Sequence, residues 1–191
     1  MDFHLLNHRP TVDPDYCILD DFPEGLGLDS YKLGKGERVG KDYPKNARIY
    51  MTDDFSGIAL PDLVSNTRNM LIVSKKVKES IERVNKGPTE YLPVAIYNHK
   101  RRLASADYFI INPLGTFDCL DLKKSRIEYH EGDVVGVDEF VLDPKKLKKA
   151  PDLFRAREDP VAYFVSERLI GEWLDMEPRP TNIHFVDLDK V

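Results

Sequence analysis

A unit that occurs twice constrains the fold of this chain more than any other feature of its sequence. Each copy reads as a short apolar segment, a serine and a helix of about three turns: residues 71–74 lead into 75–86, and residues 163–166 lead into 167–177. Serine suits the start of a helix, because its hydroxyl accepts a hydrogen bond from an unpaired amide of the first turn. Gly87-Pro88 and Pro178 end the two helices, and second apolar strands are predicted at 91–97 and 183–188.

The two predicted helices have matching apolar faces. Val77 of the first helix aligns with Leu169 of the second, and Ile81 aligns with Trp173. Apolar side chains at this spacing are typical of a helix that packs on a core. Neither copy contains a nucleophile, a general base or a set of metal ligands, so the repeat predicts a scaffold that presents a surface.

Strand-rich sequence separates the two copies. We expect strands at 107–112, 116–122, 126–130 and 134–142, a turn at 112–115 and a short basic helical turn at 145–149. Before the first copy, we expect a strand at 48–51 and a short helix at 61–66. The pattern predicts an α+β fold with a mixed or antiparallel sheet, a strand-Ser-helix-strand unit occurring twice and a β-meander between the copies.

The length of 191 residues suits a single domain over 1–191 with a sizeable core. Glycines scattered among charged residues predict an irregular N-terminal arm over 1–46, lying on an α+β body over 47–191. There is no apolar run near the ~20 residues that span a bilayer, and no signal peptide is visible. With only two cysteines as well, we expect a reduced, soluble, cytoplasmic protein without membrane contact.

The formal net charge of −5 disfavours binding to nucleic acid and suits a basic protein partner. Lys100-Arg101-Arg102 is a compact basic segment of the kind that contacts RNA, although such a run is more typical of a solvated loop. A nucleic-acid-binding regulator that uses Lys100–Arg102 therefore stays as an alternative.

Cys119 is the most plausible nucleophile, with His99 and His130 as the nearest histidines in sequence. Its neighbours Asp118 and Asp121 oppose formation of a thiolate, so we expect a buried, inert strand cysteine. The two aspartates lie three residues apart and would point to opposite faces of a strand. A small cytoplasmic enzyme that uses Cys119 or the Asp118/Asp121 pair is the second alternative.

Two other patterns are superficially like ligand sites. His4 and His8 have the spacing of a metal-binding pair on a helix, but Pro10 follows and no third ligand is evident. The glycine-rich stretch 34–41 misses the spacing of a phosphate-binding loop, and we interpret it as a mobile loop. We expect no catalytic residue, no metal and no cofactor.

The order of motifs resembles the eleventh of the numbered immunity protein families encoded beside bacterial polymorphic toxins, formerly a domain of unknown function. The resemblance covers roughly residues 45–188. It is carried by the segments 60–63, 71–74, 112–114, 117–121 with Ser125, 140–143, 153–155 and 164–166.

The resemblance implies an antitoxin that binds and neutralises a cognate bacterial toxin by stoichiometric protein–protein association. It implies a toxin domain as the partner, and a basic toxin would suit the acidic chain; a homodimer also stays open. No catalytic residues carry over from the family. The motif positions, which we expect to be structural, are Asp62, Ser74, Asn112, Asp118, Asp121, Ser125, Phe154, Arg155 and Ser166.

Overall fold

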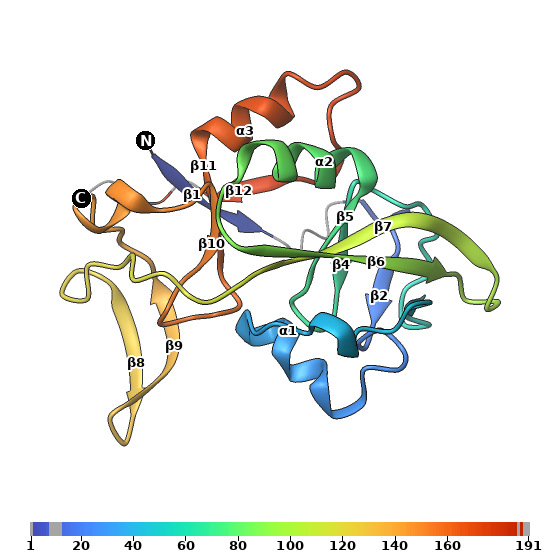
Figure 1. Cartoon of the computed structure of the whole chain (residues 1–191), viewed down its shortest axis with the longest axis horizontal. Helices are drawn as coiled ribbons and strands as arrows, with labels where there is room; N and C mark the ends of the chain where they lie inside the picture. The colour runs from blue at the N-terminus through green and yellow to red at the C-terminus, as the bar shows by residue number, and fades with distance from the viewer. Residues whose placement is uncertain (1, 8–12, 187, 189–191) are drawn as a thin grey trace.

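The computed structural model of the chain describes residues 2–7, 13–186 and 188. This part of the chain folds into strands, α-helices and 3-10 helices that form two large sheets, a β-hairpin and a helical layer (Figure 1). The strands are β1 Phe3–Asn7, β2 Ile18–Asp20, β3 Arg48–Met51, β4 Leu63–Asn66, β5 Leu71–Ser74, β6 Thr89–Tyr97, β7 Leu103–Pro113, β8 Arg126–His130, β9 Asp133–Glu139, β10 Leu153–Arg155, β11 Tyr163–Ser166 and β12 His184–Val186. The helices are η1 Gly27–Ser30, α1 Tyr31–Lys35, η2 Gly40–Asp42, α2 Lys75–Val84, η3 Lys146–Lys149 and α3 Glu167–Leu174.

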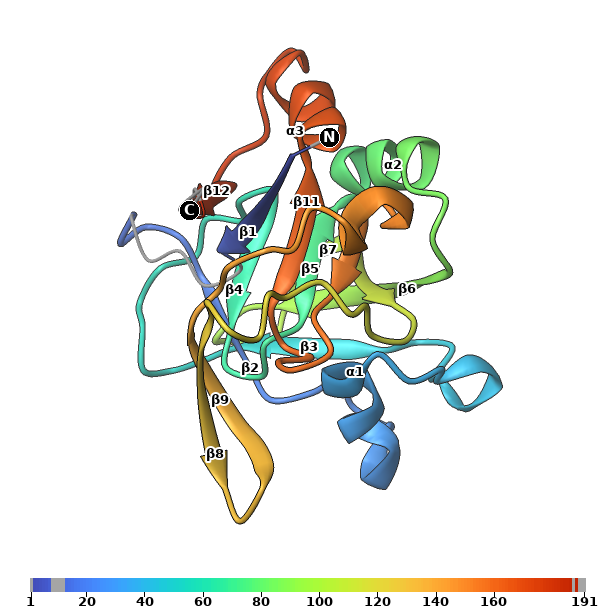
Figure 2. The same ribbon diagram turned by 90° about the vertical axis from the view of Figure 1, so that its left-hand side faces the viewer.

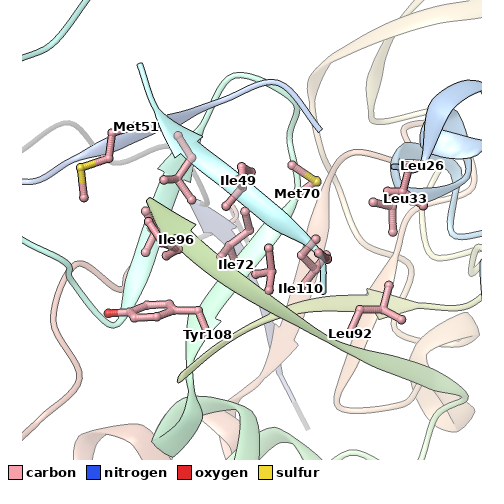
Figure 3. Close-up of a cluster of buried hydrophobic side chains, with 14 of the residues drawn as sticks. Leu26, Leu33, Ile49, Met51, Met70, Ile72, Leu92, Ile96, Tyr108 and Ile110 are labelled. Atoms are coloured by element: carbon pink, nitrogen blue, oxygen red, sulfur yellow. The ribbon is translucent and has the colours of Figure 1, made fainter. Parts of the chain in front are cut away.

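The first large sheet closes into a barrel with the strand order β2-β3-β6-β7-β5-β4. The pairs β2/β4 and β3/β6 are parallel, and the other neighbours are antiparallel. Apolar side chains fill the interior, among them Ile49, Ile72, Ile96 and Ile110, while Leu33 of α1 belongs to the same cluster (Figure 3). The expected α+β fold with a mixed sheet is confirmed, and closure into a barrel adds a feature that the sequence pattern did not predict.

The second large sheet is antiparallel and has the order β10-β11-β1-β12. Strand β1 lies inside this sheet, between β11 and β12, and β2 belongs to the barrel. The N-terminal residues therefore differ from the irregular arm that we expected over 1–46. Strands of five and three residues are too short to show a clear period, and they are stabilised by pairing with distant parts of the chain.

Both repeats build the same arrangement of strands. In the first, β5 and β6 flank the antiparallel β7; in the second, β11 and β12 flank the antiparallel β1. A further strand precedes each unit in an equivalent register, with Leu63 opposite Val73 and Leu153 opposite Val165. Each preceding strand starts from the tripeptide Pro-Asp-Leu, at 61–63 and 151–153. The repeat thus begins earlier in the chain than the predicted strand–serine–helix unit.

Helices α2 and α3, one from each repeat, lie side by side (Figures 1 and 2). Val77 of α2 and Leu169 and Trp173 of α3 share one core with residues from both large sheets. Leu6 of β1 and Leu71 of β5 belong to this core. The side chains of β5 alternate between this shared core and the barrel interior, where Ile72 lies. Burial on both faces explains the continuous apolar run Leu71–Val73.

Strands β8 and β9 form a separate two-stranded sheet that projects away from the body (Figures 1 and 2). The predicted meander is therefore wrong: β7 belongs to the barrel, and residues 116–122 form only isolated bridges at Phe117 and Leu120. The helix expected at 61–66 is also wrong, because β4 is held there between β2 and β5. In both places long-range pairing overrides local sequence preference.

Candidate functional site

Each repeat has an aspartate–serine junction at the start of its helix. The Ser74 hydroxyl donates to an Asp62 carboxylate oxygen at 2.6 Å, and Ser166 donates to Asp152 at the same distance. The backbone amides of both serines also donate to the carbonyl oxygens of the same aspartates. Ser166 accepts from the amide of Leu169 as a true N-cap, whereas Ser74 forms no capping bond, which corrects the expectation of two serine caps. Both motif serines therefore bind the aspartate at the start of the same repeat.

A basic side chain two residues after each serine binds the same carboxylate. Lys76 lies 2.9 Å from Asp62, and Arg168 pairs with Asp152. Asp62 also accepts from the backbone amide of Thr181 at 2.9 Å. Burial raises the pKa of Asp62, but the hydrogen bonds from Ser74, Thr181 and Lys76 outweigh it and hold the pKa below its usual value. The junctions therefore tie the helix starts to neighbouring segments.

Asn112 and Arg155 meet beneath the N-terminal helices. The Asn112 amide donates to the Glu37 carbonyl at 2.9 Å and to the Glu90 carboxylate at 3.1 Å. Arg155 is 1% exposed and donates to the carbonyl oxygens of Leu33, Pro113 and Pro160. The two side chains are 3.4 Å apart, so they hold α1 and the following loop against the barrel.

The glycine-rich stretch 34–41 is correspondingly anchored and does not form the mobile loop that we expected. The backbone amides of Val39 and Gly40 donate to the carboxylate of Glu90 at 3.0 and 2.8 Å. Gly36 closes α1 with a φ of 69°. A Cβ at Gly36 would lie 2.9 Å from two carbonyl oxygens, so this turn requires glycine. No local sequence pattern predicts these contacts, because Glu90 lies 50 and 51 residues away from the two amides.

Asp118, Asp121 and Ser125 fasten the two ends of the segment that carries the β8–β9 hairpin. Ser125 exchanges hydrogen bonds with the backbone of Val141, at 3.0 and 3.2 Å, and the Asp121 amide donates to the same residue. Asp118 binds Lys146 at 2.6 Å and Arg157 at 3.2 Å. The Lys146 hydrogen bond is the main cause that lowers the pKa of Asp118.

Phe154 lies in an aromatic cluster behind this segment. Its ring is 3% exposed and packs against Phe3, Phe117 and Phe164, with centroid distances of 5.1–5.5 Å. The same core contains Leu120 and, at its edge, Val137 of β9. Phe154 thus supports the base of the hairpin.

The enzyme alternative draws little support from the geometry of Cys119. Its side chain is fully buried, and burial followed by the charges of Glu158 and Asp118 raises the pKa of its thiol to about 12. Asp118 is engaged in ion pairs with Lys146 and Arg157, and the Asp121 side chain accepts from the Lys123 amide. The structure therefore does not bring these groups together as an exposed acid–base or nucleophile site.

The histidines are likewise dispersed. His4 lies on β1, 3.9 Å from Glu167, and His99 lies 3.4 Å from Asp53; His8 is outside the described residues. His130 and His184 are exposed on separate strands. Within residues 2–7, 13–186 and 188, no group of three or more His, Cys, Asp or Glu side chains is placed to hold a metal ion.

The basic segment Lys100–Arg102 forms the turn between β6 and β7. The Arg101 guanidinium lies 4.0 Å from the centroid of the Tyr50 ring, and Tyr50 packs against Tyr97 at 5.6 Å. The Arg101 guanidinium therefore covers one face of the Tyr50 ring. Among the helices of the described chain, none is long and apolar enough to cross a membrane.

Most residues of the β8–β9 hairpin are exposed. Tyr129, Val134 and Val135 lie near its tip with 57%, 37% and 61% of their surfaces exposed. Five carboxylates and one arginine leave residues 126–139 with a formal charge of −4, against −5 for the whole chain. An exposed apolar group on a charged, projecting element is typical of a protein-binding surface.

The motif residues thus make hydrogen bonds, ion pairs and ring contacts that join distant segments of the chain. The sequence profile of the immunity protein family (Imm11) matches residues 4–190, which is nearly the whole chain. The protein belongs to this immunity protein family. The match includes most of the N-terminal segment, which lay outside the resemblance seen in the sequence. A comparison with curated proteins finds no match.

Proposed function

We propose that this chain is a cytoplasmic antitoxin of a bacterial polymorphic toxin system, which binds one cognate toxin domain and neutralises it by stoichiometric association. The observation that carries the proposal is membership of the immunity protein family over residues 4–190. In this role the protein serves interbacterial competition, protecting its cell from a toxin delivered by a neighbour or made by the cell itself. It needs no turnover, metal or cofactor.

Protection must hold against small numbers of toxin molecules, so the complex must be tight. A nanomolar dissociation constant corresponds to about −12 kcal/mol at 25 °C. The acidic chain would gain association rate from a basic toxin, and this gain would weaken as salt screens the charges.

Co-expression with the toxin domain encoded beside the gene tests the proposal. Growth should be rescued, and the two proteins should co-purify as a defined complex. The matched control is a chain destabilised by Trp173→Ala, which should rescue less in proportion to its lower folded population. Rescue without any complex, at far less than one copy per toxin, would show that the mechanism is different.

A further inference from the structure

The β8–β9 hairpin has one apolar face and one polar face. Across its antiparallel register Ile127 lies opposite Val137 and Tyr129 lies opposite Val134, and such cross-strand partners share a face of the sheet. The intervening pair, Glu128 opposite Gly136, lies on the other face.

The apolar face is covered only at its base. Val137 packs against the core around Cys119 and Leu120, and Ile127 is half-buried. The tip projects beyond the rest of the molecule (Figure 1). There Tyr129, Val134 and Val135 are exposed, within a stretch of seven residues. Exposed apolar clusters of this kind mark interaction sites on soluble proteins.

The base of the hairpin is held firmly, so that the tip stands in a defined place. Ser125 and Asp121 bind Val141, and the amide of Asp143 donates to the Cys119 carbonyl at 2.8 Å. Arg126 and Asp138 form an ion pair at 3.1 Å where β8 begins and β9 ends. A preorganised element loses less conformational entropy when it binds.

The charge of the hairpin indicates what kind of surface it fits. Glu131 and Asp133 lie at the tip, Glu128 lies on the polar face, and Asp138 and Glu139 lie at the base beside Arg126. Arg126 is the only Lys or Arg between 126 and 139. Two hairpins from separate copies would repel one another, whereas a basic surface would be attracted.

Side chains, and not the strand edges, are suited to make the contact. The register of β8 and β9 is interrupted twice, between Arg126 and Ile127 and between Glu128 and Tyr129. Irregular pairing and edge carboxylates are the features with which proteins discourage the addition of a further strand.

We propose that the distal apolar face of the β8–β9 hairpin, centred on Tyr129, is where the toxin domain docks, and that the toxin surface it meets is apolar at its centre and basic at its rim. The proposal rests on the immunity function proposed above. Tyr129 is the central anchor, since tyrosine is enriched among the residues that dominate binding energy, and Val134 and Val135 flank it. The carboxylates guide association and select against acidic partners.

The test measures binding to the toxin domain encoded beside the gene, carrying a substitution that removes its toxicity. Tyr129→Ala should raise the dissociation constant by about 30-fold or more, mainly through faster dissociation. Leu103→Ala is the matched control, because Leu103 is 56% exposed at the start of β7, a strand of the barrel and not of the hairpin. The turn between β6 and β7 lies at the opposite end of the molecule from β8 and β9 (Figure 1). It should leave the dissociation constant within about 2-fold of wild type.

Two charge-reversal variants test the contribution of the carboxylates at the tip. Asp133→Lys should lower the association rate by about 3-fold or more and flatten its dependence on salt, while Asp107→Lys, on the exposed start of β7, should change either value little. Trp173 fluorescence and the melting temperature monitor the fold of each variant. If Tyr129→Ala is destabilised, Val135→Ser tests the apolar face in its place.

The possible outcomes separate the two proposals. Tight wild-type binding that is unchanged by Tyr129→Ala and Val135→Ser would overturn the docking surface and leave the immunity function standing. Wild-type protein that neither binds nor protects would instead reject the immunity function with this toxin. A wild-type dimer in light scattering that Tyr129→Ala converts into a monomer would assign the hairpin to self-association and overturn the docking proposal.

Discussion

The indole N–H of Trp173 donates a hydrogen bond to the Ser80 hydroxyl at 2.8 Å and so joins the helices of the two repeats. Both side chains are buried, and the Ser80 hydroxyl in turn donates to the Val77 carbonyl. The Trp173 ring also stacks on Phe185 of β12, with 6.0 Å between centroids. The repeats are therefore held together by a polar contact inside an apolar core.

We expect Trp173→Ala to lower the free energy of unfolding by about 3–5 kcal/mol, because it leaves a cavity and removes the hydrogen bond from the indole to Ser80. Leu174→Ala, at the neighbouring and 47% exposed position, should change it by less than about 1 kcal/mol. Urea unfolding followed by circular dichroism measures both. Equal midpoints for the two variants would contradict the buried helix interface.

Asp62 should make stability depend on pH. Its pKa in the folded protein lies below its value in the unfolded chain, so its stabilising effect is complete above roughly pH 3.9 and is lost as the pH falls through the folded pKa. The stability difference between wild type and Asp62→Asn should thus be largest near neutral pH and shrink below about pH 4. A difference that stays constant between pH 7 and pH 2 would rule out this contribution, and Asp107→Asn is the exposed control.

Cys17 and Cys119 should resist thiol reagents in the native protein. Both are buried, and burial raises the pKa of each thiol to about 12, so little thiolate exists at neutral pH. Labelling by iodoacetamide should become rapid only in denaturant, as mass spectrometry can follow. Fast labelling of Cys119 in the folded chain would reopen the enzyme alternative.

Leu6 tests the place of the N-terminal segment. Its side chain is 1% exposed and lies in the core shared by the two repeats, so Leu6→Ala should cost about 2–5 kcal/mol of unfolding free energy. Leu28→Ala is the control, because Leu28 is 96% exposed in η1. If both variants unfold at the wild-type urea concentration, β1 does not contribute to the core as described.

Local patterns predicted the strand–serine–helix units well, because helix period, serine junctions and proline breakers lie within a few residues of one another. Closure of the barrel depends on pairing β2 with β4 and β3 with β6, which are far apart in sequence. The position of β1 between β11 and β12 is equally non-local. Strands as short as β1–β4 have too few residues for a sequence period to indicate either pairing.

The sequence predicted a structural role for the motif residues but not the partners that they contact. Ser125 binds a backbone group sixteen residues away, and Arg155 binds the carbonyl of Leu33 at a separation of 122 residues. The sequence did contain one missed signal: the tripeptide Pro-Asp-Leu at 61–63 and 151–153 marks the start of both repeats. With it, the aspartates that bind Ser74 and Ser166 could have been paired in advance.

Titration of toxin activity shows whether protection comes from a one-to-one complex. Purified protein is added to a fixed amount of the toxin domain, at concentrations well above the dissociation constant. We predict that residual toxin activity falls in a straight line and reaches zero at one equivalent. Complete inactivation at a small fraction of an equivalent, or full activity with several equivalents present, would contradict neutralisation by stoichiometric binding.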